Sequence, residues 1–307
     1  MFLVCGEALM DVFAVGDTPT GVTLDARVGG SPFNVAVGLA RLAQPVAFLG
    51  AVSRGFLGER LMRALKAEGV TLAHVARTDA PTTLGLVGLD EKGVPSYSFY
   101  GEGAADRQLL PEALPSTSFQ ALHLGSYTTV VEPTASTLRL LVQREHGKTL
   151  ISYDPNVRLN VQPDLARWRE LLQWMLPRTD LLKISDEDLG LLMPGSTPEA
   201  FAAEALVQGV KLAVVTRGGE GASAWTAARA SASVPTPKVT VIDTVGAGDT
   251  FQAALLTWLA EHGSVSPQAL AGLSGAQLND ALGFAARAAA ITCSRRGADM
   301  PRRAELG

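Results

Sequence analysis

Asp243-Thr-Val-Gly-Ala-Gly-Asp-Thr-Phe251 is the stretch from which both the fold and the chemistry of this chain can be inferred. A strand-like piece, Val239–Ile242, comes before it. After it, apolar residues recur at helical spacing from Phe251 to Leu259, and Gly263 is typical of the end of such a helix. The stretch therefore predicts a glycine turn between a strand and a helix.

The glycine turn and the acid that follows it suggest phosphoryl chemistry. Gly246 and Gly248 let the backbone bend, so that several N–H groups point the same way at the positive end of the helix dipole. Such a turn binds phosphate oxygens. Asp249, in the first helical turn, can accept a proton from an attacking hydroxyl group. An Asp alone at this position is an ordinary helix cap, so the inference depends on the whole stretch.

Short apolar runs that alternate with helical patterns predict an α/β protein with a mainly parallel sheet, covered by helices on both faces. The predicted strands are Phe2–Cys5, Val46–Val52, Ala121–Gly125, Thr149–Tyr153, Asp180–Ile184 and Lys211–Thr216.

Two helical regions frame the rest of the chain. Ser31 followed by Pro32 reads as an N-cap and first-turn proline, and Val35, Leu39 and Leu42 then form one apolar face. Residues 266–294 are rich in alanine and are predicted to be helical. The tail, residues 301–307, is expected to fray.

Two segments, approximately 12–28 and 83–100, do not fit the alternation of strands and helices. The second reads as strands Leu84–Leu89 and Ser96–Tyr100 around a turn at 90–93. Because no linker or repeat interrupts the chain, we expect a single domain, 1–307, with these segments inserted as a small β-sheet.

Composition narrows the class of protein. Hydrophobic residues make up 47% of the 307 positions, which predicts a large core. The net charge of −4 gives no basic footprint for nucleic acid, and no apolar run reaches the roughly 20 residues of a membrane span. Two distant cysteines, no metal-ligand cluster and no targeting segment favour the cytoplasm. The four histidines show no ligand spacing and are expected to be structural or exposed.

The chain resembles the ribokinase-like (PfkB) carbohydrate kinases. Residues 243–251 match the C-terminal signature of that family, and Gly29-Gly30-Ser31-Pro32-Phe33-Asn34-Val35-Ala36 matches the N-terminal one. Asp154-Pro155-Asn156-Val157-Arg158 and Thr216-Arg217-Gly218-Gly219-Glu220-Gly221 keep the family order between them. The resemblance implies a three-layer α/β/α sandwich with a small β-sheet lid that closes over a sugar and, in relatives, often supports a homodimer.

The resemblance also implies a role for each matching residue. Asp249 would be the general base, and the amides of Gly246, Ala247 and Gly248 would form an anion hole. The implied sugar-binding residues are Asp11, Gly29, Gly30, Asn34, Phe99, Arg107 and Arg158. The implied nucleotide-binding residues are Asn156, Lys183, Thr216, Gly218, Gly219 and Gly221.

Several of these residues also have purely structural interpretations. Asp11 can be a turn residue at a strand end and Asn34 a local cap. The two glycines at 29–30 can simply end a strand, and the glycines of 216–221 can form a hairpin turn. A single Arg such as Arg158 is usually a surface residue.

The implied cofactors are ATP and Mg²⁺, with K⁺ as a further candidate. Asp188 would hold Mg²⁺ through water, although Ser185 and Asp188 replace the Asn and Glu of the family's Asn-x-x-Glu region. Asp243, Val245 and the 292–297 loop resemble the parts that bind a monovalent cation in many relatives. Ala286 stands where related fructokinases tend to have an Asn beside the adenine, so the adenine contacts stay open.

Several short segments of the sequence are most similar to those of bacterial fructokinases. This similarity predicts phosphorylation of fructose. 2-Keto-3-deoxygluconate kinase is the main alternative, because Arg107 and Arg158 can clamp a substrate carboxylate. Ribokinase, a nucleoside-type kinase and a non-catalytic sugar sensor of the same fold are less favoured. A dehydrogenase and a P-loop kinase are excluded, because the G-x-G-x-x-G and G-x-x-x-x-G-K-[ST] motifs are absent.

Overall fold

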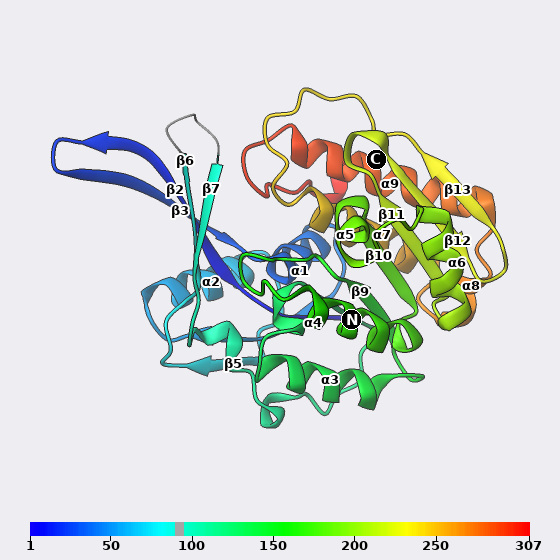
Figure 1. The fold of residues 1–307 in the computed structure, drawn as a ribbon, viewed down its shortest axis with the longest axis horizontal. Coiled ribbons are helices and arrows are strands. Elements are labelled where there is room, and N and C mark those ends of the chain that lie inside the picture. Colours follow the sequence, from blue (N-terminus) through cyan, green and yellow to red (C-terminus); the bar gives the residue numbers. More distant parts are fainter. Residues whose placement is uncertain (90–94) are drawn as a thin grey trace.

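A nine-stranded sheet with the order β13-β12-β11-β10-β9-β8-β1-β4-β5 forms the centre of the molecule (Figure 1). The computed structural model describes residues 1–89 and 95–307. The predicted turn at 90–93 lies outside the described residues. The strands are β1 (Phe2–Cys5), β4 (Val46–Ser53), β5 (Val75–Thr78), β8 (Ala121–Gly125), β9 (Leu150–Asp154), β10 (Leu181–Ser185), β11 (Leu212–Thr216), β12 (Ala222–Thr226) and β13 (Ser231–Val234).

Helices cover both faces of this sheet because successive strand residues alternate between two cores. Phe2 and Val4 of β1 belong to one core, while Leu3 and Cys5 belong to the other. The first core is covered by α1 (Ser31–Arg41), α2 (Phe56–Ala67), α7 (Ala247–Glu261), α8 (Pro267–Ala271) and α9 (Gly275–Cys293). The second is covered by α3 (Thr134–Glu145), α4 (Leu165–Met175), α5 (Asp186–Leu192) and α6 (Pro198–Gln208). The three-layer α/β/α prediction is confirmed.

A second sheet, which we call the lid sheet, stands out from this body (Figure 1). Its order is β3-β2-β6-β7, made of β2 (Leu9–Thr18), β3 (Gly21–Gly29), β6 (Leu84–Leu89) and β7 (Pro95–Tyr100). The two hairpins are antiparallel, as predicted, but β2 and β6 join them through a parallel pair. Only Gly30 separates the end of β3 from the start of α1.

The six predicted strands of the body are present, each within one residue of its predicted bounds. They pair in parallel, and the sheet ends in the antiparallel strands β12 and β13. Strand β1 lies between β8 and β4, so the chain runs outward from it in both directions. In open α/β sheets, ligands bind beyond the carboxyl ends of the strands at such a switch point.

The predicted strand Val239–Ile242 is wrong. Val239, Val241 and Ile242 are 40%, 61% and 57% exposed, and no strand covers this segment. The amides of Ile242 and Asp243 donate instead to the carbonyl oxygen of Cys293, at the end of α9. The segment is apolar, but it crosses the surface and has no neighbouring strand with which to pair.

The predicted N-cap of α1 is also wrong. Gly30, with a φ of 107°, is the N-cap of α1, and Ser31 is the first helical residue. The prediction that residues 266–294 are helical is confirmed; the stretch forms two helices, because Ser274 and Gln277 form a capping box that starts α9 afresh.

The predicted fraying of the tail is wrong as well. Residues 303–305 form a short 3₁₀ turn, and Arg303 makes a two-bond ion pair with Glu261 of α7, at 2.8 and 3.1 Å. Nearby, Arg302 contacts Glu68 at 3.1 Å. Charged pairs therefore fix a tail that has few apolar residues of its own.

Among the described residues, no helix is long and apolar enough to cross a membrane.

Candidate active site

The carboxylate of Asp249 lies at the N-terminus of α7, where it is held by two residues of α1. Ser31 Oγ donates a hydrogen bond to Asp249 Oδ1 at 2.7 Å, and Asn34 Nδ2 donates to Oδ2 at 2.8 Å. The two helices touch, since a Cβ added at Gly38 of α1 would lie 2.7 Å from the Cβ of Ala253 on α7. Close helix packing therefore places Ser31 and Asn34 against the acid.

Burial raises the pKa of Asp249, and its neighbours oppose that effect. The hydrogen bonds from Ser31 and Asn34 lower the pKa, as do the charges of Lys183 and Arg158. These donors and cations stabilise the ionised form, which is the form able to accept a proton.

The glycine turn beside this acid has the predicted geometry. Gly246 is the N-cap of α7 and adopts a left-handed conformation with a φ of 75°, which glycine takes without strain. The Ala247 amide donates to the Thr244 carbonyl at 3.2 Å. Within residues 1–89 and 95–307, the amides of Gly246 and Gly248 have no hydrogen-bond partner. Two of the three predicted anion-hole amides are thus open, and the third is shared.

A buried ion pair lies directly beside this turn. Lys183 Nζ of β10 is 2.6 Å from Asp154 Oδ2, at the end of β9, and the two side chains are 5% and 4% exposed. A Cβ added at Gly248 would lie 3.4 Å from the same Nζ. Asp154 Oδ1 is buried and has no hydrogen-bond partner in the described part of the chain. The lysine is therefore fixed with its charge next to the helix N-terminus.

Further charged groups surround this pair at the carboxyl end of the sheet. Burial and, to a smaller extent, the charge of Asp154 raise the pKa of Asp188 to about 6. The half-buried Arg158 lowers the pKa of Asp11, Asp188 and Asp249. Arg158 is therefore within electrostatic reach of three carboxyl groups that are far apart in sequence, and it is not the isolated surface residue that a single Arg usually is.

The lid sheet contributes Asp11, whose carboxylate fits between two glycines. A Cβ at Gly29 of β3 would collide with Asp11 Oδ2, and one at Gly85 of β6 would lie 3.0 Å from Oδ1. Burial raises the pKa of Asp11 to about 6; the charge of Arg158 lowers it and that of Asp249 raises it. Gly29 is thus explained by close approach, and Asp11 lies within a strand and not at a strand end.

The base of the lid sheet rests on a buried polar group. A Cβ at Gly30 would lie 2.9 Å from the carbonyl oxygen of Glu7, so these backbones touch. Burial raises the pKa of Glu7 to about 7, although a hydrogen bond from Thr128 Oγ1 at 2.9 Å supports its charged form.

Phe99 of the lid sheet and Arg107 of the body both lie against Tyr127. The rings of Phe99 and Tyr127 are edge to face at 6.4 Å, and Arg107 Cζ is 5.9 Å from the Tyr127 ring centroid. Gly85 also approaches this group, because a Cβ there would lie 3.4 Å from Phe99 Cζ. Phe99 is thus beside the strand that flanks Asp11, and Tyr127 lies between Phe99 and Arg107.

The remaining predicted nucleotide residues lie along the carboxyl ends of β9 and β11. Thr216 is the last residue of β11, and residues 218–220 form a short 3₁₀ turn that leads through Gly221 into β12. The turn is part of a hairpin, as its structural interpretation predicted. No heavy atom lies within 4 Å of a Cβ added at Gly218 or Gly219, so this turn borders open space. Asn156, after β9, has a φ of 42°.

Asp243 ties the start of the glycine turn to the loop after α9. Its Oδ1 accepts from the Val245 amide at 3.0 Å, and its Oδ2 accepts from the Gly297 amide at 2.8 Å. A Cβ at Gly246 would lie 2.6 Å from Ala298 Cβ, so the same loop packs behind the predicted anion hole.

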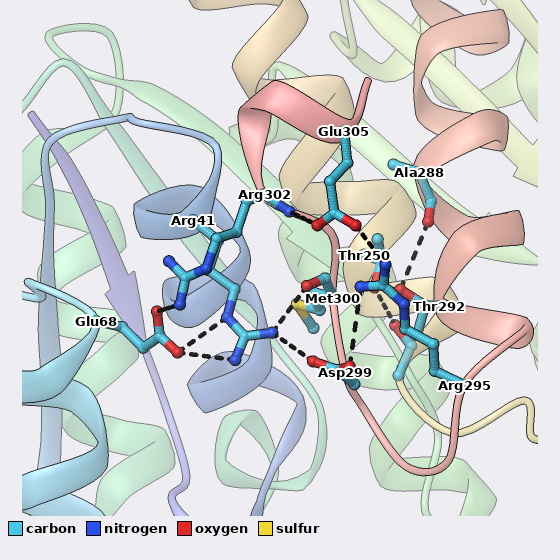
Figure 2. Close-up of polar contacts among 11 residues, drawn as sticks. Arg41, Glu68, Thr250, Ala288, Thr292, Arg295, Asp299, Met300, Arg302 and Glu305 are labelled. Carbon is cyan, nitrogen blue, oxygen red and sulfur yellow. Dashed lines mark hydrogen bonds and ion pairs between the residues drawn. The ribbon is translucent and has the colours of Figure 1, made fainter. Parts of the chain in front are cut away.

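Figure 2 shows what holds that loop in place. Arg41, at the end of α1, donates to Glu68 at 2.8 and 3.0 Å, and to Asp299 and the Met300 carbonyl at 2.8 Å each. Arg295 pairs with Asp299 at 3.8 Å and also with Glu305. The loop is therefore anchored to α1 just after Ala298, and Arg295 joins it to the tail.

Sequence reasoning missed two residues of this site. Ser31 was interpreted as a cap, although its hydroxyl reaches Asp249, 218 positions away. Gly85 was not singled out, although a glycine inside a strand pattern often marks a close approach and could have indicated it.

Together these groups can carry out one kind of chemistry. Amides at a helix N-terminus and a fixed lysine can hold a phosphoryl group, and a carboxylate within the same turn can take a proton from a hydroxyl. Asp11 lies close enough to this carboxylate that the charge of Asp249 helps to raise the pKa of Asp11.

Comparison with known proteins agrees with this chemistry. The family described as pfkB family carbohydrate kinase matches residues 1–304. A fructokinase from Rhizobium leguminosarum bv. trifolii is 38% identical over 261 residues, which are 84% of this chain and 79% of the relative.

Two crystal structures show the same ribokinase-like fold. A fructokinase from Xylella fastidiosa with bound ATP has a TM-score of 0.89 and 30% identity, over 99% of this chain and 96% of that one. A fructokinase variant from Vibrio cholerae O395 with bound fructose, ADP and potassium ion has a TM-score of 0.84 and 26% identity, over the same shares of the two chains. The chain therefore belongs to the pfkB family of carbohydrate kinases, which are phosphotransferases with an alcohol group as acceptor.

Proposed function

We propose that this carbohydrate kinase transfers the γ-phosphoryl group of ATP to a hydroxyl of fructose, with Asp249 as the general base. The observation that carries the proposal is the position of the Asp249 carboxylate, which is beside the open amides of Gly246 and Gly248 and is held by Ser31 and Asn34. A proton acceptor and an anion-binding turn in contact are the two parts that phosphoryl transfer to an alcohol needs.

In this mechanism the lid sheet and the body bind different reactants. Asp11, which can only accept hydrogen bonds when ionised, binds sugar hydroxyls and sets one of them against Asp249. Asp249 removes the hydroxyl proton as the oxygen attacks phosphorus. The open amides and Lys183 hold the negative charge of the transferred group. Phe99 supplies an apolar wall, and closure of the lid sheet excludes water.

The residues present also fit ATP and its metal ion. Gly218 and Gly219 border open space that can admit a nucleotide, and Lys183 is fixed beside the turn. Asp188 lies near Asp154, whose Oδ1 lacks a partner, and carboxylate oxygens are what Mg²⁺ prefers. Asp188 would hold the ion through water, and the bound ion would offset phosphate charge. Main-chain oxygens of Asp243 and Val245 would hold K⁺.

Fructose is favoured over a sugar acid by the relatives and by the charges of the site. The Rhizobium relative is a fructokinase, and the Vibrio relative has fructose bound. The charge of Arg158 already stabilises the ionised forms of Asp11, Asp188 and Asp249. A substrate carboxylate would have to compete with these three groups for Arg158. Arg107, whose Nε has no partner in the described part of the chain, keeps 2-keto-3-deoxygluconate as the second candidate.

Coupled measurement of ADP release with Mg-ATP and a panel of sugars tests the proposal. We expect turnover with fructose, and a kcat about 10² to 10⁴ lower in Asp249→Asn, the usual effect of losing a general base. Asp280→Asn, an equivalent change on the exposed side of α9, is the control and should retain full activity. Turnover of ketodeoxygluconate alone would select the second candidate, and no turnover of any sugar would favour a sensor.

The homodimer is part of the same proposal. The projecting hairpin exposes Val15, Val22 and Leu24 at 57%, 52% and 49%, an apolar surface that a second copy would cover. Light scattering should give twice the 32.1 kDa of one chain. Val22→Asp with Leu24→Asp should halve that mass, and a monomeric parent protein would refute the dimer.

A further inference from the structure

The hydroxyl of Ser31 forms a hydrogen bond with Asp249 and does not cap its own helix, α1. The N-terminal amides of an α-helix lack partners, and a serine near that end usually satisfies one of them. Here the hydroxyl hydrogen points to Asp249 Oδ1 at 2.7 Å, on a different helix. Ser31 is 8% exposed, so water has little access to compete for this bond.

The two bonds from α1 fix the carboxylate in a way that neither could alone. Ser31 and Asn34 are three residues apart and therefore share one face of the helix. Each contacts a different oxygen of Asp249. A single donor would leave the carboxylate group free to turn about its Cβ–Cγ bond, whereas two donors on different oxygens define its plane. Each oxygen retains a lone pair for a substrate hydroxyl.

We infer that Ser31 is a positioning residue for phosphoryl transfer, and that its Oγ–H···Oδ1 bond orients the Asp249 carboxylate toward the acceptor hydroxyl. The inference deepens the proposed function and rests on it. Ser31 takes no proton itself; the proton passes from the substrate oxygen to Asp249 as the oxygen–phosphorus bond forms and the bond to the leaving ADP breaks.

The electrostatic surroundings predict how loss of this bond would be seen. Besides Ser31 and Asn34 on α1, the groups that act on Asp249 are Lys183 of β10 and Arg158 after β9. Asp11 of the lid sheet is also within electrostatic reach, since the charge of Asp249 raises the pKa of Asp11. The bond from Ser31 lowers the pKa of Asp249. Its removal must therefore raise that pKa, because the charged form loses a donor while the other groups stay in place.

Ser31→Ala, Ser31→Thr and Ser266→Ala test the inference together. Alanine is the better helix former, so Ser31→Ala should fold. Threonine keeps the hydroxyl. Ser266 is the N-cap of α8 and accepts from the Ala269 amide, so its loss is a matched removal of a serine that acts only on its own helix.

The expected result for Ser31→Ala is a fall in kcat of about tenfold, with the KM for sugar little changed, because the lost bond orients the base and does not touch the sugar. The acid limb of the pH profile of kcat/KM should move to higher pH, since that limb reports the base of the free enzyme. Ser31→Thr should keep the limb of the parent protein even where packing of the added methyl group lowers kcat. Ser266→Ala should lower the melting temperature without moving the limb.

A second measurement separates this inference from the proposed function. The ¹³C resonance of the Asp249 carboxyl, assigned by its absence in Asp249→Asn, should titrate at higher pH in Ser31→Ala than in the parent protein or Ser31→Thr. This readout needs no substrate. Failure of the parent protein to phosphorylate any sugar would refute the proposed function. The titration would still test whether the hydrogen bond from Ser31 acts on the Asp249 carboxylate. An unshifted resonance, an unshifted limb, or equal shifts in the Ala and Thr variants would overturn the inference.

Discussion

Asp11 on the lid sheet and Lys183 in the body are both charged residues of the candidate active site, but their surroundings differ. Lys183 is buried and paired with Asp154 at 2.6 Å. Asp11 is partly exposed, and the absence of side chains at Gly29 and Gly85 makes room for it. Its nearest influences, Arg158 and Asp249, have opposite effects on its pKa.

The difference suggests how the proposed site would hold its two reactants. A charge that is paired inside the sheet stays in place whether or not a ligand is bound, and it stabilises the fold through its partner. A charge that is desolvated without a fixed partner costs stability until a ligand's hydroxyl groups satisfy it. Under the proposed function, the body would be preorganised before any ligand binds, whereas Asp11 on the lid sheet would depend on the ligand.

Breaking the buried pair should have the largest effect. Lys183→Met leaves the Asp154 carboxylate buried and unpaired, and should lower the free energy of unfolding by about 3 to 5 kcal/mol. Urea denaturation measures this. Lys66→Met, at an exposed position of α2, is the control and should change the same quantity by less than about 0.5 kcal/mol.

A loss in Lys183→Met below about 1 kcal/mol would mean that the pair is not as buried as its geometry indicates. Adding Asp154→Asn to Lys183→Met should recover much of the stability, because the double variant no longer buries an unpaired charge.

Asp11→Asn should raise the free energy of unfolding, whereas Lys183→Met lowers it. A carboxyl group whose pKa is raised from 3.8 to about 6 by folding binds more protons in the folded state between these values, so stability falls as the pH rises through that range. Removing the charge should raise the free energy of unfolding at pH 7 by up to about 2 kcal/mol, after allowance for partial exposure. The same variant should bind sugar more weakly.

Denaturation at pH 4 and pH 7 checks this, because the two proteins should differ at pH 7 and converge at pH 4. Asp17→Asn, an exposed change on the same strand, should alter neither stability nor the KM for sugar. Lower stability of Asp11→Asn at pH 7 would contradict the contrast with Lys183.

Gly29→Ala tests the space beside Asp11 without removing its charge. The added Cβ would collide with Asp11 Oδ2, so the carboxylate must turn away, and the KM for sugar should rise about tenfold with a smaller change in kcat. Gly16→Ala on the same hairpin is the matched control, because no heavy atom lies within 4 Å of a Cβ there. Equal kinetics in the two variants would show that Asp11 has room to spare.

The smallest effect should come from the exposed pair that fixes the tail. Arg303 and Glu261 are 34% and 29% exposed, so salt and water screen their attraction. Arg303→Ala should lower the free energy of unfolding by no more than about 1 kcal/mol, and a double-mutant cycle with Glu261→Ala at low and high salt isolates the pair. A loss comparable to that of Lys183→Met would remove the distinction between buried and exposed pairs.

Much of this architecture was predictable because the body is buried on both faces. Runs such as Leu150–Asp154 are continuously buried, and their apolar residues specify a strand without help from distant parts of the chain. The apolar run at 239–242 misled for the same reason, since only its place on the surface shows that no strand is near. Edge strand β5 was not predicted, because all four of its residues are only half-buried.

The site was predictable as a set of residues but not as a set of contacts. Asp249, Asp11 and Lys183 could be named from motifs, yet the bond from Ser31 to Asp249 depends on how α1 and α7 meet. The tail could not be foreseen either, because Arg302 and Arg303 find their partners on α2's C-cap and on α7. Local sequence patterns carry no information about such distant partners.

The single residue between β3 and α1 has a mechanical consequence. Ser31 and Asn34 lie in the first turn of the helix that Gly30 joins to the lid hairpin, so a displacement of that hairpin would reach the donors of Asp249 through a single residue. A residue inserted beside Gly30 would uncouple the orientation of the Asp249 carboxylate from the position of the hairpin, and would leave α1 and α7 intact. Through this joint, the orientation of the Asp249 carboxylate would depend on the position of the β2–β3 hairpin.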